Sequence, residues 1–153
     1  MSEFPDEAAD WLQTYIDENH EFLSWLGTSI DELDEGYMRM VVPYDRKLTN
    51  RRPDGGGEEP LEMHGGVAAT LIDTAGGLAL RTALDDPVSG GVATINLNVN
   101  YLRRATADLV AEAEVVRAGG SVGVSHVSVE SEGPNGERRP VATGQGAYRL
   151  FRR

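Results

Sequence analysis

Three neighbouring features of the sequence could carry chemistry: His64, the pair Gly65-Gly66, and Asp73. Glycines at the start of a helix leave backbone N–H groups free at the positive end of the helix dipole, a place that stabilises a developing oxyanion. A carboxylate two turns further along could serve the same reacting carbonyl, either within one chain or only from a second subunit. Two glycines at a helix start are equally compatible with a plain tight turn.

The segment after His64 is expected to form a helix that is buried on all sides. Its apolar residues fall within one arc of about 140° at 100° per residue; they are Val67, Ala68, Leu71, Ile72, Ala75, Leu78 and Ala79. The opposite side carries mostly small residues, which allow another backbone or a ligand to approach closely, and Asp73 is its only acid. A buried carboxylate is costly unless it is paired or used, so Asp73 either hydrogen-bonds a nearby backbone group or has a functional role.

Hydrophobic spacing before this helix predicts another helix, a strand and a long loop. Within the N-terminal segment 1–27, residues 5–26 are expected to form one helix with Pro5 in its first turn, and Gly27 suits its end. Residues 37–42 are expected to form a strand. The polar segment 45–62 carries DGGGEEP in its middle, and we expect a loop here that is either a lid or a disordered tip.

Strand patterns dominate after Gly90 and complete an α+β fold in a single domain, residues 1–153. Four consecutive strands are expected, with a hairpin turn at GPNG, residues 133–136. The valine spacing changes phase near Ser125 and His126, which predicts a bulge there. One long helix against a meandering antiparallel sheet is the expected architecture, with strands adjacent in sequence pairing most often.

The composition predicts an ordinary globular protein with an acidic surface. The chain has 153 residues, 40% of them hydrophobic, and a formal net charge of −11. It contains no cysteine and only three scattered histidines, so we expect no disulfide, no thiolate metal site and no histidine metal cluster. The acidic N-terminus does not match a signal peptide, and a cytoplasmic location follows by default. Nucleic acid and anionic membranes are poor candidate partners for so negative a protein.

The segment around Asp73 resembles the PaaI-like (phenylacetate-pathway) acyl-CoA thioesterases. The matching features are HGG, six residues and then Asp73, together with FLSWLG, HGGVAATLIDTAGGLAL and ATINLNVNYLRRA, so the resemblance spans residues 22–150. It implies a hotdog fold, in which a curved antiparallel β-sheet wraps around a long central α-helix, with active sites at the interface of a homodimer or homotetramer. It also implies hydrolysis of acyl-CoA thioesters without a metal or organic cofactor.

The resemblance assigns roles to five positions. Asp73 would be the general base or the nucleophile, and the Gly65 amide would polarise the thioester carbonyl. His64 would shape the turn, and Thr94 stands where the family commonly has a hydroxyl residue that helps to place the water or the carboxylate. Gly66 is expected to contribute to substrate binding.

The family also usually carries an asparagine about six residues before the histidine, and here that spacing falls on Glu58. Asn50, in the family-like LTN, is the better counterpart, with RRPDGGGEEPLEM inserted before His64. The insertion lengthens the loop beside the expected active site and leaves the role of Asn50 and the substrate preference open.

Three arginines, Arg103, Arg104 and Arg117, are candidates for contacts to the coenzyme A phosphates, although arginines at strand ends are commonly plain surface residues. Asn96, Asn98 and Asn100 could line a dimer seam or form the solvated face of a strand. The acyl group could be aromatic, short or medium in length. Two other functions fit the fold: a hotdog hydratase or dehydratase, which the HGG-x6-D spacing disfavours, and a non-catalytic acyl-CoA-binding protein.

We expect salt to stabilise this protein and to speed its encounter with substrate. Twenty-five acidic residues against fourteen basic ones produce self-repulsion, which dissolved salt screens within about 10 Å at 0.1 M. The same charge repels an anionic coenzyme A ester, and this repulsion should outweigh any local arginine–phosphate contact. The melting temperature and kcat/KM should therefore both rise as potassium chloride increases from dilute to molar concentration. A flat or falling melting temperature would contradict the expectation.

Overall fold

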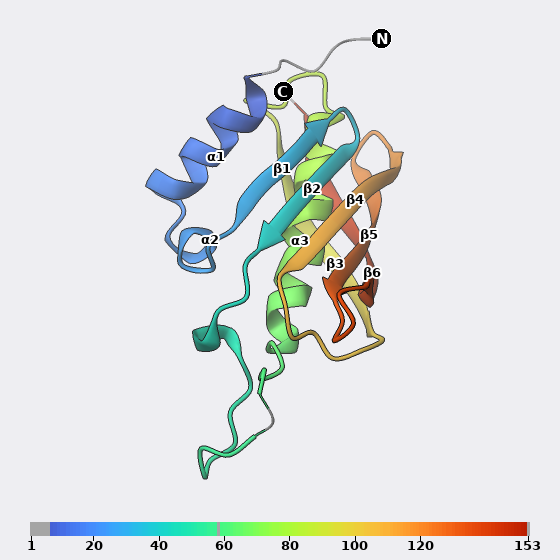
Figure 1. The fold of residues 1–153 in the computed structure, drawn as a ribbon. Helices are drawn as coiled ribbons and strands as arrows, with labels where there is room; N and C mark the ends of the chain where they lie inside the picture. Colours follow the sequence, from blue (N-terminus) through green and yellow to red (C-terminus); the bar gives the residue numbers. More distant parts are fainter. Residues whose placement is uncertain (1–6, 58, 153) are drawn as a thin grey trace.

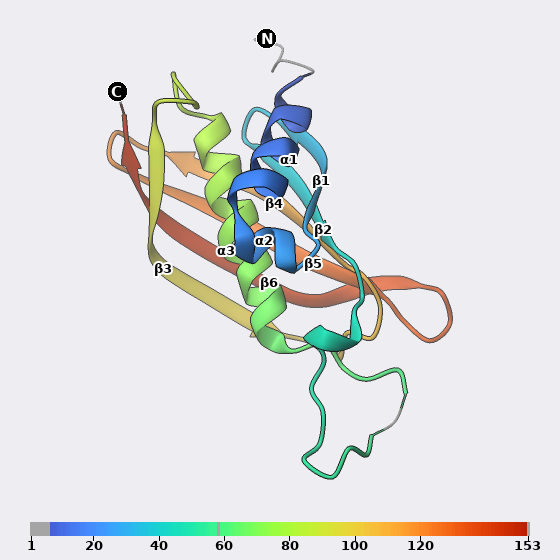
Figure 2. The ribbon, with the colours of Figure 1, turned by 90° about the vertical axis from the view of Figure 1, so that its left-hand side faces the viewer.

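One long helix, α3 (Gly65–Thr82), lies inside the curve of a six-stranded antiparallel sheet (Figure 1, Figure 2). The computed structural model describes residues 7–57 and 59–152, so Pro5 and Glu58 lie outside the described residues. The strands are β1 (Ser29–Asp34), β2 (Tyr37–Val42), β3 (Gly91–Tyr101), β4 (Leu109–Ala118), β5 (Val122–Glu132) and β6 (Arg138–Phe151). The predicted α+β hotdog architecture is confirmed. None of the described helices is long and apolar enough to cross a bilayer.

The strand order is β1-β2-β4-β5-β6-β3. Strands adjacent in sequence pair in three cases, as expected, but β3 pairs with β6 rather than with β4. The chain enters β3 directly after α3, and residues 102–108 then carry it across to place β4 beside β2. As a result β3 is an edge strand of the sheet, next to the helix that carries Asp73.

The core lies between α3 and the concave face of the sheet. Met38, Met40 and Val42 alternate inward along β2, and they pack with the apolar arc of α3, of which Leu71, Ile72, Ala75 and Ala79 are all at most 1% exposed. This arc agrees with the one expected from the spacing. The helix is not buried on all sides, however, because Ala69, Thr70, Asp73 and Thr74 are only partly buried and Gly66 is exposed.

The N-terminal segment forms two helices instead of the single predicted one, α1 (Ala8–Asn19) and α2 (Glu21–Trp25). His20 separates them with a non-helical backbone, φ −119° and ψ 83°, and its Nδ1 atom accepts a hydrogen bond from the Leu23 N–H at 3.3 Å. A side chain that caps α2 in this way favours a new helix start over continuation of α1. The hydrophobic spacing runs through the break and does not reveal it.

An irregularity does lie beside Ser125, as predicted, but the extra residue is Val116 of β4 and not a residue of β5. Burial alternates without interruption along β5, because Gly123 and Ser125 occupy the inward positions between the valines. Ser125 lies against α3, where its hydroxyl donates to the Gly76 carbonyl at 2.8 Å. The pairing of β4 with β5 shifts between Val115, which pairs with Ser125, and Arg117, which pairs with Val124, and the pairing of β5 with β6 shifts near Val129.

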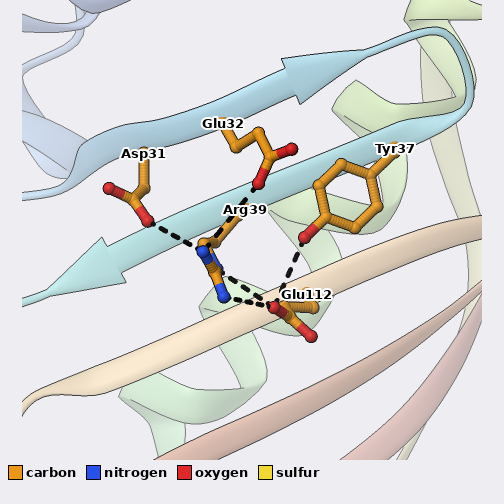
Figure 3. A network of polar contacts seen from close by, with 5 residues as sticks. All are labelled: Asp31, Glu32, Tyr37, Arg39 and Glu112. Carbon is orange, nitrogen blue, oxygen red and sulfur yellow. Dashed lines mark hydrogen bonds and ion pairs between the residues drawn. The ribbon is translucent and has the colours of Figure 1, made fainter.

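An ion-pair network links three strands on the face of the sheet opposite to α3. Figure 3 shows Arg39 of β2 between Asp31 and Glu32 of β1 and Glu112 of β4. The shortest contact joins Arg39 Nη2 to Glu112 Oε1 at 2.7 Å, and the Tyr37 hydroxyl donates to the same carboxylate at 3.3 Å. Partial burial, followed by the charge of Glu112, raises the pKa of Tyr37. One arginine therefore offsets the repulsion among three carboxylates where β1, β2 and β4 lie side by side.

Close contact between α3 and β6 depends on a notch made by Gly76 and Gly77. A Cβ atom on Gly76 would lie 2.5 Å from Tyr148 Oη, and one on Gly77 would lie 3.2 Å from Tyr148 Cε1. Tyr148 is 1% exposed, and its hydroxyl donates to the Asp73 carbonyl at 2.8 Å. Burial, followed by the charge of the Asp73 carboxylate, raises the pKa of Tyr148, so its hydroxyl stays protonated as a donor.

We expect Gly76→Ala to lower the free energy of unfolding by about 1–3 kcal/mol, because the added methyl group overpacks against Tyr148 and Val127. Gly120→Ala is a matched control, since a Cβ there has no neighbour within 4 Å. Urea unfolding of both variants at one protein concentration measures the difference. Equal midpoints for the two variants would show that the notch does not constrain the helix.

Candidate functional site

The start of α3 is organised by His64. This residue is the N-cap, with φ −60° and ψ 134°, and its Nδ1 atom accepts a hydrogen bond from the Gly66 N–H at 2.8 Å. The Gly65 carbonyl accepts a hydrogen bond from the Tyr101 hydroxyl of β3 at 2.7 Å. The Gly65 N–H is in the first turn, where a helix provides no acceptor, and no residue in the described part of the chain accepts from it. This amide is therefore available to an anionic or carbonyl oxygen.

A Cβ atom at either glycine would make a close contact with a neighbouring side chain. A Cβ atom on Gly65 would lie 3.0 Å from Tyr101 Cε1, and one on Gly66 would lie 2.9 Å from His64 Nδ1. Both residues line a hollow of about 290 Å³ together with His64, Tyr101 and Arg103. Its remaining wall is mostly apolar, so the hollow could hold a hydrocarbon group beside the helix start.

Asp73 lies on the partly open stripe of α3, two turns after Gly65. The Thr94 hydroxyl of β3 donates to Asp73 Oδ1 at 2.6 Å, and Tyr148 holds the backbone carbonyl of the same residue. Within residues 7–57 and 59–152, no hydrogen bond engages Oδ2. The carboxylate is thus fixed through one oxygen and free through the other, as a base or a nucleophile must be.

A second hollow, of about 430 Å³, lies in front of this carboxylate. Its wall combines Thr70 and Thr74 of α3 with Leu97 of β3 and Phe22 of α2. Phe22 is 53% exposed. The hollow therefore offers apolar surface beside the second oxygen of the Asp73 carboxylate.

Gly65 and Asp73 of one chain cannot act on the same atom. Eight residues of helix separate them by about 12 Å along the axis and by about 80° around it. A reacting carbonyl needs both its oxyanion donor and its base or nucleophile within about 3 Å. The two groups therefore belong to one reaction centre only if a second chain supplies one of them.

Asn50 lies at the base of the long loop. Its N–H donates to the Glu62 carbonyl at 2.8 Å, and the preceding residue, Thr49, forms an isolated antiparallel β-bridge with Met63. The His64 N–H donates to the Leu48 carbonyl at 2.8 Å. These bonds bring Asn50 next to the segment before α3 despite the intervening loop. Its side chain lines a separate hollow and makes no hydrogen bond to another described residue.

The candidate arginines are divided among different places. Arg103 Nη1 donates to the Pro140 carbonyl at 2.8 Å, and Arg104 pairs with Glu62 at 3.5 Å. Both lie near the start of α3, on the walls of neighbouring hollows. Arg117 lies toward the opposite end of β4, eight residues beyond Leu109 of the first hollow. The structure thus places Arg103 and Arg104, but not Arg117, near Gly65.

Comparison with known proteins agrees with this geometry. Residues 62–137 match the family model of the Thioesterase superfamily. A provisionally named esterase of Halobacterium salinarum is 50% identical over 149 residues, covering 96% of this chain and 95% of that protein. The chain therefore belongs to the thioesterase superfamily, a family of thioester hydrolases.

Solved structures resemble the whole chain. A thioesterase family protein of Silicibacter pomeroyi is 26% identical with a TM-score of 0.76, and the match covers 95% of this chain and 98% of that one. The PaaI protein from the phenylacetic acid degradation operon of Escherichia coli, at 22% identity, has a TM-score of 0.72 with 92% of each chain covered. At 22% identity, the similarity to the PaaI protein shows that the two chains share a fold.

Replacing Thr94 by Val should lower kcat for thioester hydrolysis by roughly tenfold to 100-fold, because the Asp73 carboxylate loses the bond that orients it. Thr94→Ser keeps the hydroxyl and should retain most of the activity. The comparison requires rates for both variants at saturating substrate, with their melting temperatures as a check on folding. Similar losses in the two variants would assign Thr94 a packing role instead.

Proposed function

We propose that this protein hydrolyses the thioester bond of an acyl-CoA, giving the free acid and coenzyme A. The observation that carries the proposal is the Asp73 carboxylate, held by Thr94 through one oxygen and open through the other to a hollow with polar and apolar walls. Apolar surface beside the carboxylate suits an aromatic acyl group or a short to medium chain.

The proposed reaction uses the Gly65 amide at the start of α3 and the Asp73 carboxylate two turns further along the helix. The Gly65 N–H donates to the thioester carbonyl oxygen and stabilises the negative charge that develops there. Asp73 either attacks the carbonyl carbon or removes a proton from the attacking water. The carbon–sulfur bond then breaks, and the coenzyme A sulfur leaves with the bonding electrons and takes up a proton. If Asp73 is the nucleophile, the acyl group remains on its carboxylate as an anhydride, which water hydrolyses to the free acid; if Asp73 is the base, the water oxygen is already on the acyl carbon and the acid is released directly. Asn50 and His64 would support the helix start, where the carbonyl is bound.

A homodimer is the minimum assembly that this mechanism requires, because Gly65 and Asp73 of one chain lie too far apart. The exposed edge strand β3 carries Thr94 next to Asp73, and Asn96, Asn98 and Asn100 are exposed along it. An unpaired edge of this kind favours association with a second copy. Pairing through β3 would bring a second Asp73 close to the first chain, and two dimers could associate further into a homotetramer.

Asp73→Asn should lower turnover by roughly 10² to 10⁴, because it keeps the volume but removes the base or nucleophile. The assay is release of free thiol from a panel of aromatic, short-chain and medium-chain acyl-CoA esters. The protein has no cysteine, so a thiol reagent reports coenzyme A alone. Melting temperatures of the variant and the parent control for folding. Unchanged turnover, or a parent protein that releases no thiol from any ester, would reject the proposal.

The oxyanion role of Gly65 can be isolated with two variants. Gly65→Pro removes the N–H at a position where helices accept proline, and the extended backbone of His64 suits a following proline. Gly65→Ala adds the same Cβ atom beside Tyr101 but keeps the N–H. We expect kcat to be lower in the proline variant than in the alanine variant by about 10² to 10³. Co-expression of Gly65→Pro with Asp73→Asn should restore activity if each site uses two chains, and failure to restore it would reject a shared site.

A further inference from the structure

An arginine-lined hollow lies at the base of the loop between η1 (Arg46–Leu48) and α3. Figure 1 and Figure 2 show this loop projecting beyond the sheet at the end where α3 begins. The hollow measures about 690 Å³, and Arg51, Arg52 and Arg104 are on its wall with Asn50 and Glu62. It is distinct from the hollow that contains Gly65 and from the one that contains Asp73.

The wall of this hollow is positive on a strongly negative protein. Arg104 is offset by Glu62 at 3.5 Å, but the side chains of Arg51 and Arg52 make no ion pair or hydrogen bond to any other residue that the structure describes. The nearby Asp54 is engaged in the loop itself, where it accepts from the Gly56 N–H at 2.9 Å. Two exposed guanidinium groups with no partner among residues 7–57 and 59–152, on a chain of net charge −11, create a local site for anions.

The arginine-lined hollow is tied to the start of α3 by backbone hydrogen bonds. The Met63 N–H donates to the Ala105 carbonyl at 2.8 Å, which joins the segment before α3 to the segment that carries Arg103 and Arg104. Glu62 lines both this hollow and the one that contains Gly65. Arg103 lines the hollow that contains Gly65, and Arg104 lines the arginine-lined hollow. A ligand with a carbonyl at one end and several phosphates at the other matches this arrangement.

We propose that Arg51 and Arg52, together with Arg104, bind the phosphate groups of coenzyme A. This inference rests on the proposed function, because it takes the substrate to be an acyl-CoA. The planar guanidinium fork binds phosphate oxygens in pairs, and arginine stays charged at every relevant pH. Arg51 and Arg52, the first two residues of the segment inserted before His64, thereby offer guanidinium groups to a polyanionic substrate that the net charge of the protein repels.

The test compares thioesters with and without phosphates in a variant that carries Arg51→Gln and Arg52→Gln. The substrates are the acyl-CoA that the parent enzyme hydrolyses fastest and the N-acetylcysteamine thioester of the same acid. We expect KM for the acyl-CoA to rise about fivefold or more, with kcat retained and with no change for the phosphate-free thioester. The control carries Arg138→Gln and Arg149→Gln, two exposed arginines of β6 that line neither the arginine-lined hollow nor the one at Gly65. Equal changes for both thioesters, or a KM increase no larger than in the control, would overturn the proposal.

A binding measurement separates this proposal from the proposed function. Titration calorimetry with adenosine 3′,5′-bisphosphate, at one potassium chloride concentration for all proteins, should show binding to the parent and to the control but at least fivefold weaker binding to the Arg51/Arg52 variant. Hydrolysis of acyl-CoA without any nucleotide binding by the parent would reject the phosphate site alone. Arginine-dependent nucleotide binding without thioester hydrolysis would keep the site and reject the enzymatic function.

Discussion

The position of α3 within the sheet depends on the contact between Tyr148 and the glycines of the helix. The Gly76-Gly77 notch lets the helix approach β6 until the Tyr148 hydroxyl reaches the Asp73 carbonyl. The same approach places the Asp73 side chain within reach of Thr94 on β3. A packing constraint at the centre of the fold thus fixes both the backbone and the side chain of the candidate reactive residue.

Charge is distributed unevenly around this packed centre. Carboxylates outnumber basic groups along the chain, and Arg39 offsets three of them on the outer face of the sheet. Other arginines gather near the start of α3, where Arg104 is paired with Glu62 and the guanidinium groups of Arg51 and Arg52 contact no acid in the part of the chain that the structure describes. On a protein with a net charge of −11, this group of arginines would orient an anionic ligand toward the start of α3 under the proposal made above.

Local spacing predicted the elements whose residues follow a regular period. The predictions of the central helix, β2 and the turn at residues 133–136 are confirmed. These elements were predictable because apolar residues recur at a regular period in the helix and the strand, and because the turn residues are consecutive. The strand β1 was missed, since SIDELD has only Ile30 and Leu33 as apolar residues and they do not alternate. Tyr148 was missed because it lies 75 residues from Asp73, and no local pattern reports so distant a contact. The glycine pair in α3 was the available signal, but it does not say which side chain fills the notch.

The roles of Asp73, Gly65, Asn50 and Thr94 stay predictions, since they came from motif position and need kinetic tests.

The bridge between Thr49 and Met63 makes the long loop a self-contained unit. Because both ends are held together by backbone bonds, the loop can lengthen or shorten without moving His64 or the helix start, and doubling its length costs only about 0.6 kcal/mol in closure entropy. Evolution can therefore alter this segment independently of the residues on α3. Exchange of the loop between relatives would provide a route to new ligand preferences on an unchanged chemical core.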